Sequence, residues 1–266
     1  MGVKSVAAVA VACVVLCGCA EAPANVPLNA LAHDHIGSTE VVASVKQSEI
    51  YVFVPPSELA QRGGGGLLLA LVDAGIDKTR TGRAEEAVGG LRNAVVDYDF
   101  DGRLRGELQG ALTGIAWLKV NGSRVIKDDQ PASLDQAITA SKSAAVLLAD
   151  TDYHLSNDGR ILSVTMDVRL YANTPELAAY RQTKGTSTAK SAPVNALYRN
   201  SFSENISVVG DGETREVNLP IWSADHGAKL RQALDESAAT LARRLASDLS
   251  GAASTPSVGA TALVSR

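Results

Sequence analysis

Residues 146–170 read VLLADTDYHLSNDGRILSVTMDVRL, and this stretch decides the fold. In its second half an apolar side chain occupies every other position, at Leu162, Val164, Met166, Val168 and Leu170. Asp158 and Gly159 separate the two apolar runs, and a glycine supplies the positive φ that a tight hairpin turn requires. The stretch therefore predicts an antiparallel hairpin with one polar face and one buried face that helices cover.

Other segments predict the remaining elements. Strands are expected at residues 38–54, 116–120 and 196–209, and helices within 67–96, 103–112, 133–141 and about 225–249. The strand at 116–120 should run into a turn at Asn121 and Gly122. We find no internal repeat and no second change of composition, so we predict an α+β fold in a single domain. Its sheet should be mostly antiparallel, with helices packed on one face.

The last predicted element is a long C-terminal amphipathic helix. Its apolar stripe consists of Leu230, Leu234, Leu241, Leu245 and Leu249. Asp225 is expected to cap its start and Gly251 its end. Such a stripe predicts that the helix packs on the sheet.

The first 19 residues have the layout of a signal peptide. Lys4 provides a positive charge, and residues 6–16 contain no charged or strongly polar side chain. An apolar run of this length is too short to cross about 30 Å of hydrocarbon as a helix. The run ends with LCGC at residues 16–19, which resembles the lipobox of bacterial lipoproteins. The resemblance implies a diacylglycerol on the Cys19 thiol and cleavage after Gly18, while an ordinary secretory signal remains the alternative.

This interpretation divides the chain into a signal peptide (1–18), a lipidated cysteine with a flexible tether (19–31), a periplasmic domain (32–250) and a disordered tail (251–266). Ala20 follows the lipidated cysteine. Resemblance to lipoproteins of enteric type implies that a protein without Asp at this position is sorted to the outer membrane. We therefore expect a lipid-anchored envelope protein that faces the periplasm.

The composition argues against a nucleic-acid partner. The chain has 25 basic and 29 acidic side chains, a formal net charge of −4 and no basic run. It therefore lacks the electrostatic footprint of nucleic-acid binding. The three cysteines, Cys13, Cys17 and Cys19, all lie at the extreme N-terminus, so the mature body has no thiol nucleophile once Cys19 carries lipid.

Asp97, Asp99 and Asp101 precede Gly102 and resemble the opening of a calcium loop of the EF-hand type. The twelfth position of such a loop brings a bidentate Glu, but Leu108 stands there. We predict instead that Asp99 or Asp101 caps the following helix, with calcium binding as the open alternative.

Three further groups have simple structural interpretations. The four glycines at 63–66 lack the Lys-Ser or Lys-Thr of a phosphate loop, and a loop that contacts a membrane or partner is the functional alternative. His33 and His35 are two potential metal ligands, too few for a site, and are expected to be solvated. Asp150, Asp152 and His154 should lie on the polar face of the hairpin. No catalytic residue, metal site or cofactor is predicted.

The order of elements is weakly similar to that of small periplasmic α+β lipoproteins related to the curli-secretion lipoprotein and the activators of penicillin-binding proteins. It is also similar to a broad group of bacterial lipoproteins of unassigned function. We expect a non-enzymatic lipoprotein that binds or scaffolds an envelope protein partner. The alternative is a lipoprotein that binds lipid or a small apolar ligand, in a groove between the sheet and the helices at 67–72 and 230–249. A hydrolase would require a serine, a histidine and a carboxylate to lie adjacent in a pocket.

Overall fold

The computed structural model describes residues 25–45, 47, 49–55, 82, 86–127, 136, 138–180, 196–208 and 214–251. Three predicted features lie outside these residues: the signal peptide with Cys19, the runs 63–66 and 67–72, and the tail after Gly251. The helix predicted at 133–141 is described at residues 136 and 138–140, which are helical.

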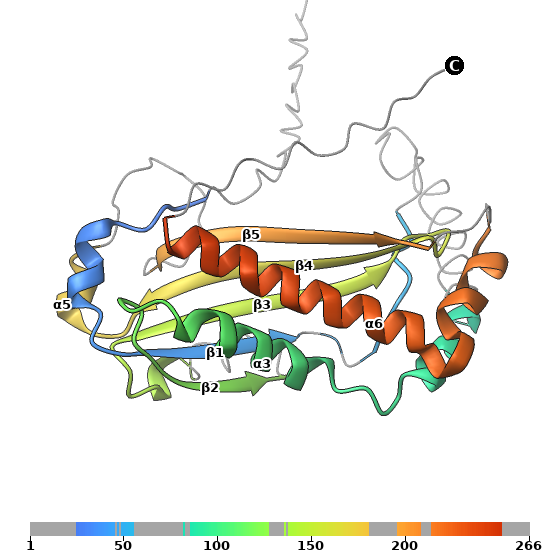
Figure 1. The fold of residues 1–266 in the computed structure, drawn as a ribbon, viewed down its shortest axis with the longest axis horizontal. Coiled ribbons are helices and arrows are strands. Elements are labelled where there is room, and N and C mark those ends of the chain that lie inside the picture. The colour runs from blue at the N-terminus through green and yellow to red at the C-terminus, as the bar shows by residue number, and fades with distance from the viewer. Residues whose placement is uncertain are drawn as a thin grey trace, which may run out of the picture.

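A five-stranded sheet forms the centre of the fold (Figure 1). In spatial order its strands are β2 (Val120–Ile126), β1 (Thr39–Val45), β3 (Ala145–Leu155), β4 (Ile161–Ala172) and β5 (Ala196–Ser207). β3 and β4 form the predicted hairpin, and β5 pairs with β4, so these two long pairings are antiparallel. β1 lies between β2 and β3 and is parallel to both. The predicted α+β domain with a mostly antiparallel sheet is confirmed.

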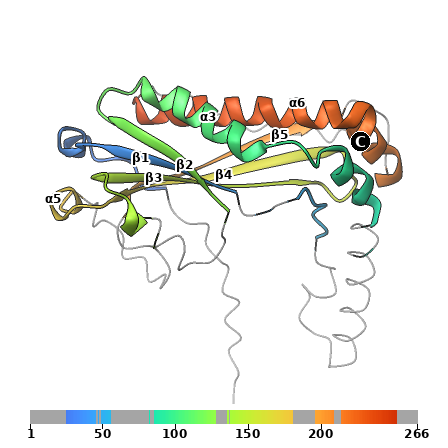
Figure 2. The same ribbon diagram turned by 90° about the horizontal axis from the view of Figure 1, so that it is seen from below.

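Two helices cover one face of the sheet, here called the inner face (Figure 2). They are α3 (Phe100–Thr113) and α6 (Arg215–Leu249). α3 begins at Phe100 rather than at the predicted Arg103. The short helices η1 (Ala30–His35) and α5 (Pro175–Ala178) contact each other at one end of the sheet. The opposite face of the sheet, here called the outer face, carries neither α3 nor α6.

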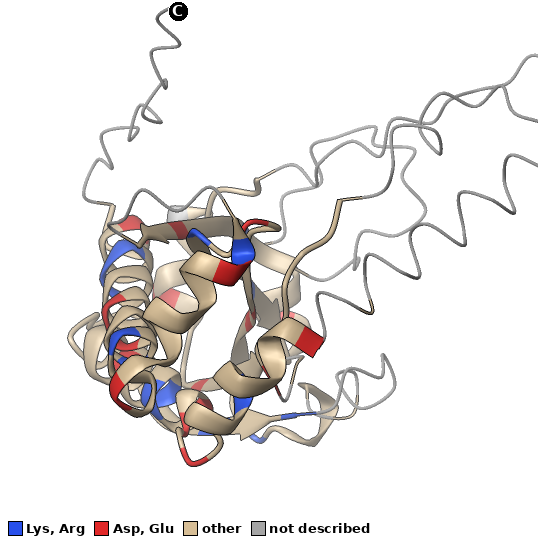
Figure 3. Ribbon diagram, turned by 90° about the vertical axis from the view of Figure 1, so that its right-hand side faces the viewer, with Lys and Arg blue, Asp and Glu red and all other residues tan. Residues whose placement is uncertain are grey.

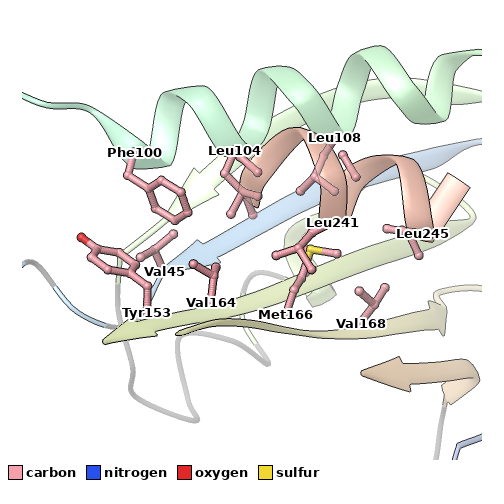
Figure 4. Close-up of a cluster of buried hydrophobic side chains, with 14 of the residues drawn as sticks. Val45, Phe100, Leu104, Leu108, Tyr153, Val164, Met166, Val168, Leu241 and Leu245 are labelled. Atoms are coloured by element: carbon pink, nitrogen blue, oxygen red, sulfur yellow. The ribbon is translucent and has the colours of Figure 1, made fainter. Parts of the chain in front are cut away.

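Side chains from both helices fill the space above the inner face (Figure 4). Leu104 and Leu108 of α3 point toward the sheet, and Leu241 and Leu245 of α6 do the same. All four are fully buried. The predicted apolar residues of β4 are also fully buried beneath them: Leu162, Val164, Met166, Val168 and Leu170. Because burying one such side chain contributes about 1.5–3 kcal/mol, this layer holds the helices on the sheet.

The C-terminal helix differs from its prediction at its N-terminal end. α6 begins at Arg215, and residues 224–227 interrupt it with non-helical backbone. Asp225 and Gly227 have φ values of 50° and 72°, and Thr214 is the N-cap, so the prediction that Asp225 caps the start of the helix is wrong. A Cβ on Gly227 would lie 2.6 Å from Val95 Cγ1, so this close approach requires glycine. The predicted leucine stripe is buried, and Gly251 ends the helix with a φ of 69°.

The first part of α6, residues 215–223, binds the turn between β3 and β4. The indole N–H of Trp222 donates to the carbonyl of Gly159 at 2.7 Å, and Trp222 is fully buried. Asn218 donates to the carbonyl of Asp158 at 2.8 Å. The hairpin turn predicted from Asp158 and Gly159 is therefore held from above by the helix.

Two strand predictions need correction. Residues 116–118 form a turn rather than a strand, and Asn121 and Gly122 lie inside β2 rather than in a turn. The register passes from Thr39–Val120 to Glu40–Gly122, so Asn121 is an extra residue in a bulge. The strand predicted at 38–54 is shorter, because β1 ends at Val45. Beyond it, Val52 alone forms a parallel bridge with Leu155.

The last residues of the predicted tether already belong to the domain. Val26 forms an antiparallel bridge with Arg199 of β5, with both backbone hydrogen bonds at 2.9 Å. Leu31 lies within η1. Part of the segment predicted as a tether therefore contacts the domain, at Val26 and in η1.

Candidate interaction surface

The three aspartates that resemble a calcium loop point to three different partners. Asp99 accepts a hydrogen bond at 3.0 Å from a backbone N–H in the first turn of α3, which confirms the predicted cap. Asp97 pairs with Arg231, and hydrogen bonding from Arg231 lowers the pKa of Asp97. Asp101 pairs with Lys127 at 2.6 Å. Nowhere in the described ranges do three or more His, Cys, Asp or Glu side chains converge to hold a metal ion.

Replacing Asp99 with alanine should lower the free energy of unfolding by about 1 kcal/mol, because α3 loses its cap. Asp99→Asn should retain most of the stability, since asparagine also caps helices well. Urea unfolding of the three proteins measures both effects. If millimolar calcium raised the melting temperature of the wild type but not of Asp99→Asn, the aspartates would be calcium ligands instead.

The two histidines of residues 33–35 stack on different aromatic rings. His33 lies against Trp117 with ring centroids 4.2 Å apart. His35 stacks on Tyr180, whose hydroxyl lies 2.6 Å from His35 Nε2. His35 is exposed and His33 is partly exposed, so both meet solvent, and their ring contacts also fasten η1 to its neighbours.

Asp152 and His154 lie on the outer face as predicted, together with Asp150. Asp152 Oδ1 lies 3.1 Å from His154 Nδ1, and the Tyr51 hydroxyl donates to Asp152 at 3.1 Å. Burial first, and then Asp152, raise the pKa of Tyr51 to about 12. Phe53 lies beside the histidine ring with centroids 5.5 Å apart. These contacts attach the segment around Tyr51 to the end of β3.

A serine also lies near this pair. Ser163 is opposite His154 in the β3–β4 register, so a serine, a histidine and a carboxylate are neighbours. The hydrogen bonds of the described residues do not join Ser163 to His154, whose ring instead contacts Tyr51 and Phe53. The geometry of an activated nucleophile is therefore not formed.

The outer face also carries two like-charged pairs. Asp150 lies opposite Asp167 in β4. Two residues after Asp167, Arg169 of β4 lies opposite Arg199 of β5. All four side chains are partly buried.

β5 is the last strand of the described sheet, and one of its edges faces away from β4. At Arg199 both backbone groups bond to Val26, on the side away from β4. In an antiparallel strand every second residue directs its N–H and C=O groups to the same side. Beyond Arg199, the residues of β5 that face away from β4 are therefore Ser201, Ser203, Asn205 and Ser207. We call residues 201–207 the open edge.

Few of the outward backbone groups on the open edge have partners in the described part of the chain. The Ser201 N–H donates to Asn200 Oδ1 at 2.9 Å. The Ser203 carbonyl accepts from Arg244 of α6 at 2.7 Å. Neither backbone group of Asn205 or Ser207 has a partner among the described residues. These groups form a template for an added strand.

The side chains of the open edge lack the usual protection against strand pairing. Its four outward residues are small, uncharged and exposed. The charged residue of this stretch, Glu204, is directed to α6, where it pairs with Arg244 at 2.8 Å. Natural edge strands are commonly blunted by lysine, proline or a bulge. The opposite edge of the sheet has such a feature, because β2 is bulged at Asn121.

A shallow pocket of about 400 Å³ lies beside β2, and most of the residues that line it are polar or charged. Arg124 and Glu40 form an ion pair across it at 2.7 Å, and Ser143 lines its rim. Burial tends to raise the pKa of Glu40, but hydrogen bonds from Ser141 and Arg124 lower it overall. The cations of this pocket are therefore partly neutralised. Along the helices, acidic and basic residues are interspersed (Figure 3).

No protein-family model matches the chain, and no curated protein matches it either. The described part of the chain contains no helix that is both long and apolar enough to cross a membrane.

The sequence predicts β5 but not that its edge is open. Its alternation of small polar residues with Phe202 and Ile206 is visible in the sequence and indicates a half-exposed strand. Which strand lies at the edge depends on the order of the sheet, and that order is a property of the fold.

Proposed function

We propose that this protein is a lipid-anchored envelope lipoprotein, facing the periplasm from the outer membrane, and that it acts as a non-enzymatic binding or scaffolding component. Its partner would be an envelope protein that adds an extended segment to the open edge of β5. The observation that carries this proposal is that the backbone groups of Asn205 and Ser207 have no partner within the described residues. Strand addition to an exposed sheet edge is a recurring mode of peptide recognition.

The contact between Val26 and Arg199 supports the geometry of strand addition. This edge already forms two antiparallel backbone hydrogen bonds at Arg199, one donated and one accepted. A partner strand that continued from there would extend over roughly 20 Å of β5, at about 3.3 Å per residue. It would bond to both groups of Asn205 and of Ser207. Because each hydrogen bond contributes about 0.5–1.5 kcal/mol net, the side chains of the partner would supply the specificity.

The predicted lipid anchor would keep this edge near the bilayer. Cys19 and Val26 are seven residues apart, and Val26 is fixed beside β5. Seven residues span at most about 25 Å. The open edge would therefore meet partners at the membrane surface.

Two rival functions have less support. A ligand groove between the sheet and α6 would require space, but Leu230, Leu234 and Leu241 are buried against the core there. A hydrolase would require an activated nucleophile, and Ser163 is not bonded to His154. Neither rival has an observation in its favour comparable to the open edge.

Asn205→Pro should reduce capture of the partner about tenfold. Proline removes an outward N–H without removing a hydrogen bond to β4, and its ring blocks an approaching strand. Loss of one or two interstrand hydrogen bonds with added steric conflict amounts to about 1.4 kcal/mol, or a factor of ten. The measurement is photo-crosslinking from position 201 in intact cells, with quantitative mass spectrometry of the crosslinked proteins.

Asn205→Ala is the matched control, because it keeps both backbone groups and changes only the side chain. It should capture the same partner at the wild-type level. Equal capture by Asn205→Pro would refute strand addition, and recovery of no specific partner by the wild type would refute the binding function. Thermal unfolding of both variants checks that the sheet remains folded.

A further inference from the structure

Arg169 and Arg199 form a like-charged pair on the outer face. They are direct partners in the β4–β5 register. Arg199 directs its backbone groups to Val26, so Arg169 and Arg199 are a non-hydrogen-bonded pair. Such pairs have Cα atoms about 4.5 Å apart and the closest side chains in a sheet. Like charges placed directly opposite each other destabilise a sheet.

Tyr171 accepts a hydrogen bond from Arg169, but the pair keeps a donor without an acceptor among the described residues. Neither Arg169 nor Arg199 takes part in an ion pair there. Arg169 Nε is buried and has no hydrogen-bond partner. A guanidinium carries five N–H donors, and an unpaired buried donor costs about 1–3 kcal/mol. An anion would supply an acceptor for this donor and a negative charge beside the pair, in addition to those of Asp150 and Asp167.

The charges around the pair act in both directions. Burial and the charge of Arg169 lower the pKa of Arg199, although the charge of Asp167 acts the other way. Burial also lowers the pKa of Arg169, but the Tyr171 hydroxyl and the charges of Asp150 and Asp167 outweigh it and raise that pKa. The two aspartates lie on one side of the arginine pair. On the other side stands Tyr171, opposite Ala196, which has only a methyl side chain. An anion would approach from this uncharged side.

We propose that Arg169 and Arg199 together bind an oxyanion, the carboxylate or phosphate group of a ligand or partner. A guanidinium presents paired N–H groups that match the oxygens of these anions. The site lies beside the open edge, since Arg199 is two residues before Ser201. It does not depend on strand addition, because it uses side chains of the outer face rather than edge backbone groups.

The test is thermal unfolding of the mature lipidated protein in a non-ionic detergent, with sodium phosphate or sodium acetate against sodium chloride at equal ionic strength. At concentrations several times the dissociation constant, the anion should raise the melting temperature of the wild type by about 2–4 °C. Arg199→Gln should lose this shift. Without added anion, Arg199→Gln should melt at or above the wild-type temperature, because the repulsion is removed.

Arg243→Gln is the matched control, since Arg243 is an exposed arginine of α6 whose hydrogen bond within the described part of the chain goes to Thr240. It should keep the full shift, including any general effect of phosphate on stability. Arg199→Lys keeps the positive charge and should show a smaller shift than the wild type, because lysine lacks the paired donors. A shift with phosphate alone would identify a phosphate group, and a shift with acetate a carboxylate. No shift in the wild type, or an equal shift in Arg199→Gln, would overturn the proposal.

Discussion

Cys19→Ala should release the protein from membranes while its domain remains folded. In the lipoprotein interpretation, acyl chains on Cys19 supply the membrane affinity, at about 0.8 kcal/mol for each buried methylene. No helix in the described part of the chain offers a substitute anchor. Folding should be unaffected, because the described domain begins to pair with the sheet only at Val26, seven residues later. Fractionation of carbonate-washed membranes measures the release, and circular dichroism of the released protein measures the fold.

Cys17→Ala provides the control for this experiment. Position 17 lies inside the lipobox but is not the residue that the resemblance assigns to lipidation. This variant should therefore remain in the washed membranes. If Cys19→Ala also remained there, another part of the chain would hold the protein, and the apolar run at 67–72 would be the first segment to delete.

The hairpin could be predicted because its two faces meet different environments. Every other residue of β4 is buried against helices, so apolar and polar residues alternate in its sequence. The sequence of β1 shows no such alternation, because Val41, Val42 and Ala43 are all buried, on both faces of the sheet. An apolar run of this kind does not encode which strands lie beside it. The parallel pairings of β1 with β2 and β3 therefore could not be predicted.

One local signal was misleading, and another element has no clear local signal. Asn121 and Gly122 are typical of a hairpin turn, but here they lie at a bulge in a parallel strand pair. The first part of α6 contains Pro220, which removes a backbone hydrogen-bond donor from the helix. What fixes this part of the helix is its tertiary contact with the hairpin turn. A contact between residues more than 60 positions apart cannot be read from local spacing.

The candidate surfaces depend on the same long-range information. The arginines at 169 and 199 are separated by 30 positions and become neighbours only through the register of β4 and β5. The open edge exists because no described strand follows β5 outward. By contrast, the cap at Asp99 acts within one turn of helix, and the sequence predicted it correctly.

Trp222→Ala should lower the free energy of unfolding by about 3–5 kcal/mol, the largest effect we expect from a single substitution in the domain. Trp222 is fully buried, and it joins the first part of α6 to the turn between β3 and β4 through its bond to Gly159. Alanine would leave a cavity and an unpaired Gly159 carbonyl. Urea unfolding, with the midpoint and the slope fitted separately, measures the loss.

Two further variants separate the causes of this loss. Trp222→Phe keeps most of the buried ring but removes the N–H donor, so it should cost about 1–3 kcal/mol through the unpaired carbonyl of Gly159. Val217→Ala changes an apolar residue of the same helical segment that is 53% exposed, and it should alter stability by less than about 0.5 kcal/mol. If Trp222→Ala cost no more than Val217→Ala, residues 215–223 would not be docked on the hairpin. If only the Trp222 substitutions lowered the free energy of unfolding, the buried contact of Trp222 would be what docks residues 215–223 on the hairpin. The sequence does not predict the helical start of this segment.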